Sequence, residues 1–376
     1  LIAIIRIFNN LTTPINIGQM SLSIIIIFSG FLLRIALIIY NIDISLLPGS
    51  EFDAGWFHHE GVRYSKYLDR KELLGDYNWE YQVGWVYGAF LGSLYYLIGI
   101  ESWYISSLLS CFVWFLSALV FRKIMLKLKY EKKYINVAII IYTFLLPTSI
   151  VYTAITLREG YMLLFFNLFA LSIINIYYEN NKRRIIFNTI VIISITCLLL
   201  ALHKGNAYFF VIFFPLMIIY YFINKSIIGI KTLIVLLIFM VFCVSFFDYG
   251  EVIFDEIKNY QLGHFSSIPD RAAYYTRDRI ENIDYGLMKL FIYVFNNFFS
   301  YFVEPTIYKI SNFKDAILFG ENTIRLILFF LIIKKSLLKF DNKILFIVFL
   351  TMIILMEGIY AQGTVNWGTA SRHHVP

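Results

Sequence analysis

The stretch LSIIIIFSGFLLRIALIIY, residues 22–40, decides the class of fold. As a helix it is long enough to cross a hydrocarbon core of about 30 Å. Several later stretches approach the same length. They are continuous apolar runs, whereas the strands of a membrane β-barrel are short segments that alternate in polarity. The pattern therefore predicts an all-α fold, a polytopic helical membrane protein.

Composition supports this class. Of the 376 residues, 59% are hydrophobic and 15% charged, whereas soluble domains usually carry about 25% charged residues. The net charge of +7 comes from basic residues clustered in short loops between apolar runs. Such loops lie on the cytoplasmic side of membrane proteins, so we expect no nucleic-acid partner. Cys111, Cys197 and Cys243 are isolated in apolar runs and predict no disulfide framework or metal spacing.

The positions of the basic loops predict a topology of about nine spans in a single transmembrane domain, residues 1–376. The basic loops then share the cytoplasmic side, in what we expect to be a bacterial plasma membrane. A start at Leu1 and a stop at Pro376 inside a polar segment leave truncation at either end open. The predicted spans are 22–40, 103–121, 135–154, 160–178, 185–202, 207–223, 226–247, 317–333 and 344–361.

Two further apolar stretches, 84–100 and 287–303, would disturb this pattern if they crossed the membrane. We expect both to be interfacial helices, the first within an outer loop 42–102 and the second within an outer loop 248–303. The aromatic residues and glycines of the first stretch suit an interface better than a lipid-facing span.

Four polar clusters fall on the outer face in this topology. Ionisable residues at span ends are costly unless they face water, a partner or a ligand. Carboxylates, cations and imidazoles on one face suit a reaction at the lipid–water boundary, with a carboxylate as general base and cations that hold a phosphate. The candidate site residues are Asp53, His58, His59 and Glu60, then Arg158 and Glu159, then His203 and Lys204, and finally Arg372 and His373.

Each cluster also has a structural interpretation. Asp53 could cap a helix that begins near Ala54, since Asp is a favoured N-cap residue. The histidines of the first cluster could simply lie at the interface. Arg158 and Glu159 could form an ion pair, and Lys204 could anchor the chain to phospholipid.

The run His58-His59-Glu60 raises a divalent metal ion as another interpretation. Adjacent residues of a helix point about 100° apart, so the three side chains cannot all face one ion. His373 and His374 could supply further ligands from the far end of the chain. The sequence therefore predicts no definite cofactor and no metal-ligating set, with a divalent metal as the alternative.

The order of these features resembles the GT-C superfamily of integral-membrane glycosyltransferases, particularly the polyprenyl-phosphate-sugar-dependent type related to family 39. Such proteins have a first span, then a large outer loop with an early acidic residue and surface helices. Here that acid is Asp53 in DAGWFH. The stretches YLIGIESW (96–103) and LPTSIVYTAITLRE (146–159) resemble later pieces in order, and GTASRHH (368–374) resembles a late basic motif of bacterial polysaccharide-assembly proteins. The paired acid that is frequent in the first motif is missing, because Ala54 follows Asp53.

The resemblance implies an inverting transfer of a sugar from a polyprenyl-phosphate-linked donor to a glycan or lipid-linked acceptor, on the outer face of the membrane. Membrane lipids would surround the donor's tail. Asp53 would be the general base that takes the proton of the acceptor hydroxyl. The other residues of the four clusters would bind substrate, with Arg158, Lys204 and Arg372 on the phosphate.

Three alternatives stay open. A polymerase or ligase for O-antigen or capsule would use undecaprenyl-diphosphate-linked repeats and rely on Arg and His. A transporter or flippase for lipid-linked sugars would carry ionisable residues within its spans and broken helices, whereas here we expect the charges at span ends. A non-catalytic scaffold could use the polar segment 248–285 to bind a partner.

Overall fold

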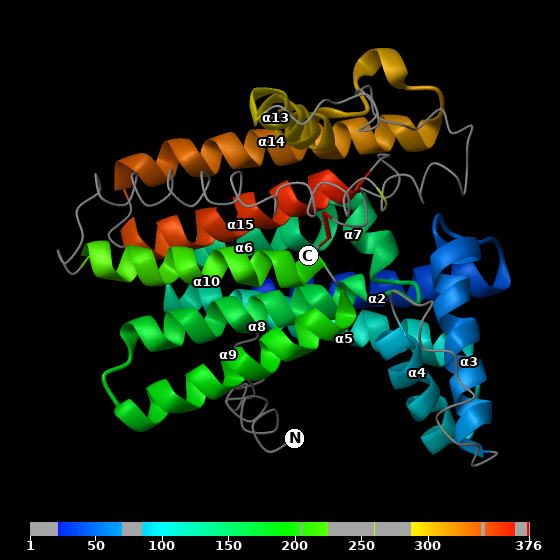
Figure 1. The fold of residues 1–376 in the computed structure, drawn as a ribbon. Coiled ribbons are helices and arrows are strands. Elements are labelled where there is room, and N and C mark those ends of the chain that lie inside the picture. Colours follow the sequence, from blue (N-terminus) through cyan, green and yellow to red (C-terminus); the bar gives the residue numbers. More distant parts are fainter. Residues whose placement is uncertain are drawn as a thin grey trace. The chain divides into compact units, whose positions relative to one another are not determined.

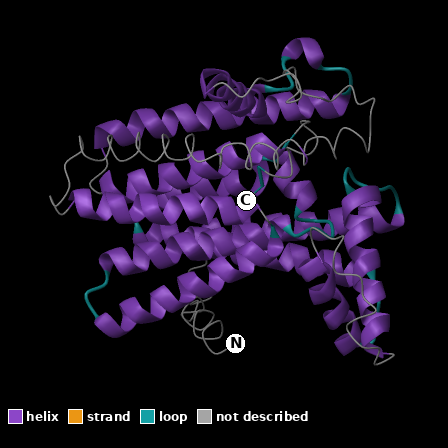
Figure 2. Cartoon of the chain, viewed as in Figure 1, coloured by secondary structure: helices purple, strands orange, loops and turns teal. Residues whose placement is uncertain are grey.

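The structure is a computed structural model that describes residues 22–69, 85–203, 205–224, 259, 287–339, 343–364 and 374–375. Within these residues the chain forms helices and loops and no strand (Figure 2), which confirms the all-α prediction. The chain divides into two compact units, Leu1–Lys204 with Val375–Pro376, and Gly205–His374. A single transmembrane domain over the whole chain stays a prediction.

Four long helices form the body of the first unit. They are α2 (Leu22–Asp43), α5 (Trp103–Lys127), α8 (Glu159–Tyr178) and α9 (Lys182–Leu202). Helix α5 packs against α2 and α8, and α8 packs against α9. All four are long and apolar enough to cross a membrane. Their bounds match four of the predicted spans.

The predicted count of about nine spans is not confirmed. Within the described residues, five helices reach the length and hydropathy of a span, the fifth being Leu345–Gln362 in α15 (Lys343–Gly363). Helix α10 (Gly205–Asn224) contains the apolar stretch Gly205–Met217, which within the described side chains is shorter than a span. Helix α14 (Phe313–Lys339) covers 317–333 but carries buried charge. The predicted span 226–247 lies outside the described residues.

The predicted span 135–154 is broken into pieces. Helix α6 (Lys132–Ile140) leads into a π-helical turn, η5 (Ile141–Leu145), and then into α7 (Pro147–Tyr152). Leu146 between them is extended, at φ −109° and ψ 94°. Pro147 explains the break, because proline has no N–H to donate and disfavours a helical residue before it.

Arg34 lies in the middle of α2 and is fully buried. Its guanidinium lies over the ring of Trp114, 3.4 Å from the ring centre. Its Nε donates to Thr153 Oγ1 at 2.7 Å, and one terminal nitrogen donates to the Gly30 carbonyl at 3.1 Å. Arg34 therefore joins α2 to α5 and to the residue that follows α7. The expectation that charges sit only at span ends is wrong here.

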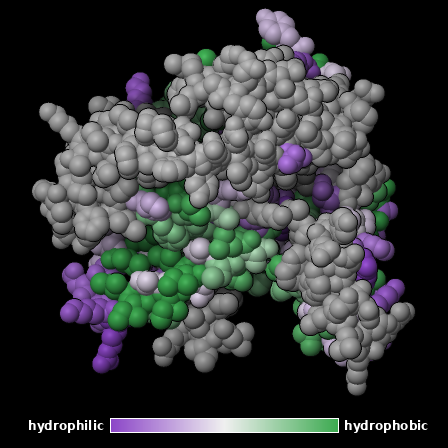
Figure 3. Space-filling model, viewed as in Figure 1, coloured by the Kyte–Doolittle hydropathy of each residue, from purple (hydrophilic) through white to green (hydrophobic). Residues whose placement is uncertain are grey.

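The basic ends of these helices also make specific contacts. Arg122 Nε donates to Ser23 Oγ at 2.8 Å, which joins the end of α5 to the start of α2. Lys127 donates to Asn175, and Arg184 pairs with Glu179 at 3.2 Å. Figure 3 shows hydrophobic side chains over α8 and α9 and hydrophilic ones where these two helices are joined. The polarity suits helices that end at a membrane surface.

Helices α3 (Gly55–Asp69) and α4 (Trp85–Ile98) pack closely against each other, and α3 runs across the direction of α8 and α9 (Figure 1). Glycines allow the close approach. A Cβ atom on Gly92 would lie 2.5 Å from the Gly61 carbonyl oxygen and 2.6 Å from Tyr64 Cβ. Small residues at such spacing let helix backbones meet. The glycines thus serve helix packing, and an interfacial position of α4 stays a prediction.

The second unit contains α10, α13 (Leu287–Val303), α14 and α15. Helix α13 packs against α14 and α15, and α15 also packs against α10. Asn297 Nδ2 donates to Gln362 Oε1 at 2.9 Å, and the Tyr360 hydroxyl donates to Asn206 Oδ1 at 3.2 Å. Polar side chains thus join these apolar helices. The stretch 287–303 is helical as expected, and its interfacial position also stays a prediction.

We expect Gly92→Ala to lower the free energy of unfolding by about 1–3 kcal/mol, because the added methyl group overpacks the contact between α3 and α4. Gly320→Ala is the matched control, since a Cβ there would meet nothing within 4 Å. That change should be neutral or stabilising by up to about 1 kcal/mol. Thermal unfolding of the purified variants measures both, and equal effects would contradict the packing role of Gly92.

Candidate functional site

Four elements of the first unit meet around two aromatic rings, which we call the Phe57–Tyr87 junction. The rings of Phe57 on α3 and Tyr87 on α4 are 5.0 Å apart and edge-to-face. Tyr87 also lies 5.3 Å from the ring of Tyr161 on α8, and its hydroxyl is 3.5 Å from Ser110 Oγ on α5. The junction therefore joins the first predicted outer loop to the ends of α5 and α8.

Arg158 connects three of the predicted polar clusters. Its guanidinium carbon lies 5.6 Å from the centre of the Phe57 ring, next to His58 in the chain. A terminal nitrogen of Arg158 donates to the Leu202 carbonyl at 2.9 Å, next to His203. His203 itself ends α9, and its N–H donates to the Leu199 carbonyl at 3.2 Å. Segments that are far apart in sequence thus share one end of the first unit.

Asp53 is half-buried in a π-helical turn, η2 (Ser50–Ala54), which continues directly into α3. The helical stretch begins at Ser50, so Asp53 lies inside it and does not cap it. The N-cap interpretation is therefore corrected. Asn41 of α2 holds the start of this turn, because its Oδ1 accepts from Leu47 N–H at 2.7 Å and from Ser50 Oγ at 2.6 Å. Asp53 lies one helical turn before Phe57.

Glu159 is 3% exposed, and its Oε2 has no hydrogen-bond partner within the described residues. Burial raises the pKa of the nearby Tyr87 phenol, and the negative charge of Glu159 raises it further. The position of Glu159 in the first turn of α8 offsets part of the cost of burying it. A buried carboxylate with an open acceptor atom needs an explanation, and a ligand site is one.

The run His58-His59-Glu60 faces three directions. His58 Nδ1 lies 2.8 Å from the Tyr95 hydroxyl, and its ring contacts that of Trp103 at 5.3 Å. His59 is exposed, while Glu60 is buried and lies 3.8 Å from Arg63. Within the described residues no three His, Cys, Asp or Glu side chains come together as metal ligands would. His58 and Glu60 have packing contacts that the sequence analysis missed.

Three predicted site residues, Lys204, Arg372 and His373, lie outside the described residues. The neighbouring His374 is described and buried in the second unit. Its Nδ1 lies 2.9 Å from Glu357 Oε2, and its ring lies 4.2 Å from that of Tyr301. Close by in the same unit, Glu321 and Arg325 form an ion pair at 2.5 Å. Charged residues inside apolar runs were the signal that could have identified this group.

Comparison of the chain with protein-family models, curated proteins and solved structures finds no match. The candidate site is therefore defined by its own geometry. It consists of the buried carboxylate of Glu159 and the guanidinium of Arg158 at the Phe57–Tyr87 junction, with the half-buried Asp53 one helical turn before Phe57. This set can accept a proton and hold an anion.

His58 provides a test of the environment of this site. Burial, and to a lesser extent the charge of His59, lowers the pKa of His58 to about 4. Between pH 6.5, near the ordinary pKa of histidine, and about pH 4, His58 is protonated in the unfolded chain and neutral in the folded one. Because the unfolded chain then binds more protons, the free energy of unfolding falls as the pH drops through this window. We expect one imidazole in the NMR spectrum of histidine-labelled protein to stay neutral down to about pH 4.

His58→Gln should remove this signal and flatten the loss of stability between pH 6.5 and 4. A signal that titrates near the ordinary pKa of histidine and disappears in the same variant would contradict the buried position of His58 between Tyr95 and Trp103.

Proposed function

We propose that this chain is a membrane glycosyltransferase. It transfers a sugar from a polyprenyl-phosphate-linked donor to a glycan or lipid-linked acceptor on the outer face of the membrane. The contact of Arg158 with both Phe57 and the Leu202 carbonyl supports the proposal most directly. It brings a cation from one loop next to the helical stretch that carries Asp53.

Asp53 acts as the general base in this proposal. Its carboxylate takes the proton of the acceptor hydroxyl as that oxygen attacks the anomeric carbon. The bond from this carbon to the lipid phosphate oxygen breaks, and the phosphate leaves with the bonding electrons. The attack from the opposite side inverts the anomeric centre.

The departing phosphate is held by cations. Arg158 suits this role because a guanidinium can hold two phosphate oxygens at once. Lys204 and Arg372 are the further candidates, with His58, His59, Glu60, Glu159, His203 and His373 as substrate-binding candidates. The open carboxylate oxygen of Glu159 supports a role in orienting a hydroxyl group.

Asp53→Asn should lower the rate of transfer roughly 10²–10⁴-fold, the usual contribution of a general base. The measurement is transfer of labelled sugar from a polyprenyl-phosphate donor in proteoliposomes. Glu131→Gln is the control, because Glu131 is exposed at the start of α6 and its side chain makes no capping bond. Wild-type turnover by the Asp53 variant would refute the assignment.

A marked preference for an oligosaccharide-diphosphate donor would favour the polymerase or ligase.

A second candidate function is transport of a lipid-linked sugar, and two observations favour it. Ionisable groups lie inside apolar helices, namely Arg34 in α2 and Glu357 in α15, which contacts His374. The break between α6 and α7 is also typical of transporters, which use interrupted helices and buried ionisable residues.

Movement of a labelled lipid-linked sugar between leaflets of reconstituted vesicles tests this second candidate. If the chain is a transporter, Glu357→Gln should abolish movement and Asp53→Asn should leave it intact, because Glu357 would carry the coupling charge. Movement that equals that of protein-free vesicles would exclude transport.

A further inference from the structure

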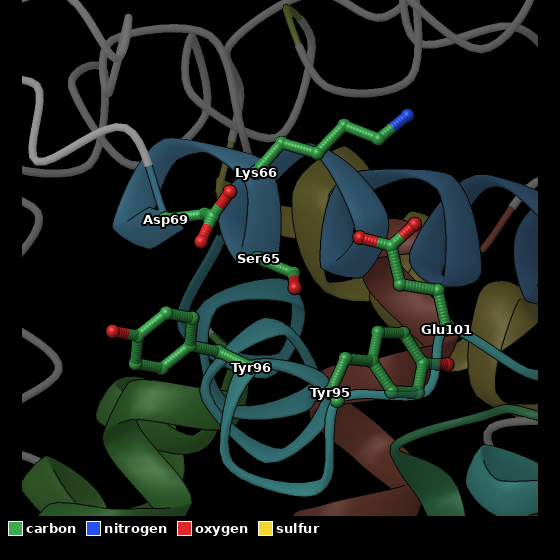
Figure 4. A pocket seen from close by; sticks show the side chains of 7 residues that line it. Ser65, Lys66, Asp69, Tyr95, Tyr96 and Glu101 are labelled. Atoms are coloured by element: carbon green, nitrogen blue, oxygen red, sulfur yellow. The ribbon is translucent and has the colours of Figure 1, made fainter.

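A pocket of ≈370 Å³ opens between α3 and α4, and none of the residues of the Phe57–Tyr87 junction line it. Figure 4 shows that the carboxylates of Asp69 and Glu101 lie on its two sides, with Tyr95 and Tyr96 below and the Lys66 ammonium pointing away. Gly99 shapes this end of α4. Its φ of +74° lets the chain turn so that Glu101 reaches the pocket.

The ionisable groups of this pocket are not used by the fold. Lys66, Asp69 and Glu101 make no ion pair or hydrogen bond within the described residues. Tyr95, by contrast, is fixed, because it is fully buried and its hydroxyl lies 2.8 Å from His58 Nδ1. Burial raises the pKa of Tyr95 to about 12, so the hydroxyl keeps its proton. The pocket thus combines a rigid floor with open acceptor groups.

The charges and hydrogen-bonding groups of the pocket favour one chemical class of ligand over others. Two carboxylates with only one ammonium at the edge repel a phosphate group. Carboxylates accept hydrogen bonds only, so they match a ligand with several hydroxyl donors. The ring of Tyr96 is 46% exposed and offers an apolar face next to them. An uncharged, hydroxyl-rich ligand fits this combination.

We propose that this pocket binds an uncharged glycosyl unit of an oligosaccharide acceptor. The inference rests on the proposed glycosyl transfer and assigns the acceptor class. Ser65, at the pocket, lies about 18 Å along the helical axis from Asp53, which is longer than one sugar ring. The pocket is therefore a remote subsite, and the acceptor extends from it toward Asp53.

Direct binding to the full chain in lipid nanodiscs, without any donor, tests the proposal. The probes are neutral oligosaccharides of increasing length, whose binding is followed by saturation-transfer NMR, with inorganic phosphate as the competitor. We expect the longer neutral oligosaccharides to bind and phosphate not to displace them. Asp69→Asn combined with Glu101→Gln should weaken binding about tenfold or more. Tyr96→Ala should weaken it and Tyr96→Phe should retain it.

The matched control is Glu131→Gln combined with Tyr134→Ala, an exposed acid and tyrosine of the same unit that do not line the pocket. Circular dichroism confirms that each variant is folded. Absence of binding, equal binding by pocket and control variants, or displacement by phosphate overturns the proposal. Asp53→Asn should bind as the wild type does, so failure of this subsite and failure of the proposed transfer give different results.

Discussion

The interaction on which the first unit depends is the burial of Arg34 in the middle of α2. A buried charge is costly unless it is hydrogen-bonded or paired, and here Trp114, Thr153 and the Gly30 carbonyl surround it. Since Thr153 directly follows α7, the last piece of the broken stretch 135–154, the Arg34 side chain anchors the segment that leads to Arg158. The hydroxyl pair of Ser106 and Thr156, 2.7 Å apart, holds the same segment against α5.

A second constraint is the close approach of α3 and α4. Glycines let the two backbones meet, and the meeting fixes His58 against Tyr95 and leaves the pocket between Asp69 and Glu101. The continuous helical stretch of η2 and α3 therefore carries the candidate base at one end and an acid-rich pocket at the other. This separation suits the proposed transfer, in which the donor phosphate lies at Arg158 and a neutral acceptor reaches from the pocket toward Asp53.

Both units bury ionisable groups among apolar helices. In the first unit they are Arg34 and Glu159, and in the second unit they are Glu321 and His374, the latter within hydrogen-bond distance of the half-buried Glu357. Such groups are expensive in a membrane and are usually functional. Because some of these groups lie inside helices and not only at span ends, transport of a lipid-linked sugar is a second candidate function beside glycosyl transfer.

The sequence by itself determined the all-α class and the places of α2, α5, α8, α9 and α15, because the length of an apolar run is a local property. It also predicted that the loops at Asp53, Arg158 and His203 share one side, since successive spans alternate in direction. Only the tertiary structure decided that 135–154 is broken, that Asp53 lies inside a helix, and that His58 faces Tyr95. These depend on how each helix is rotated and where it crosses its neighbour, which run length and composition do not encode.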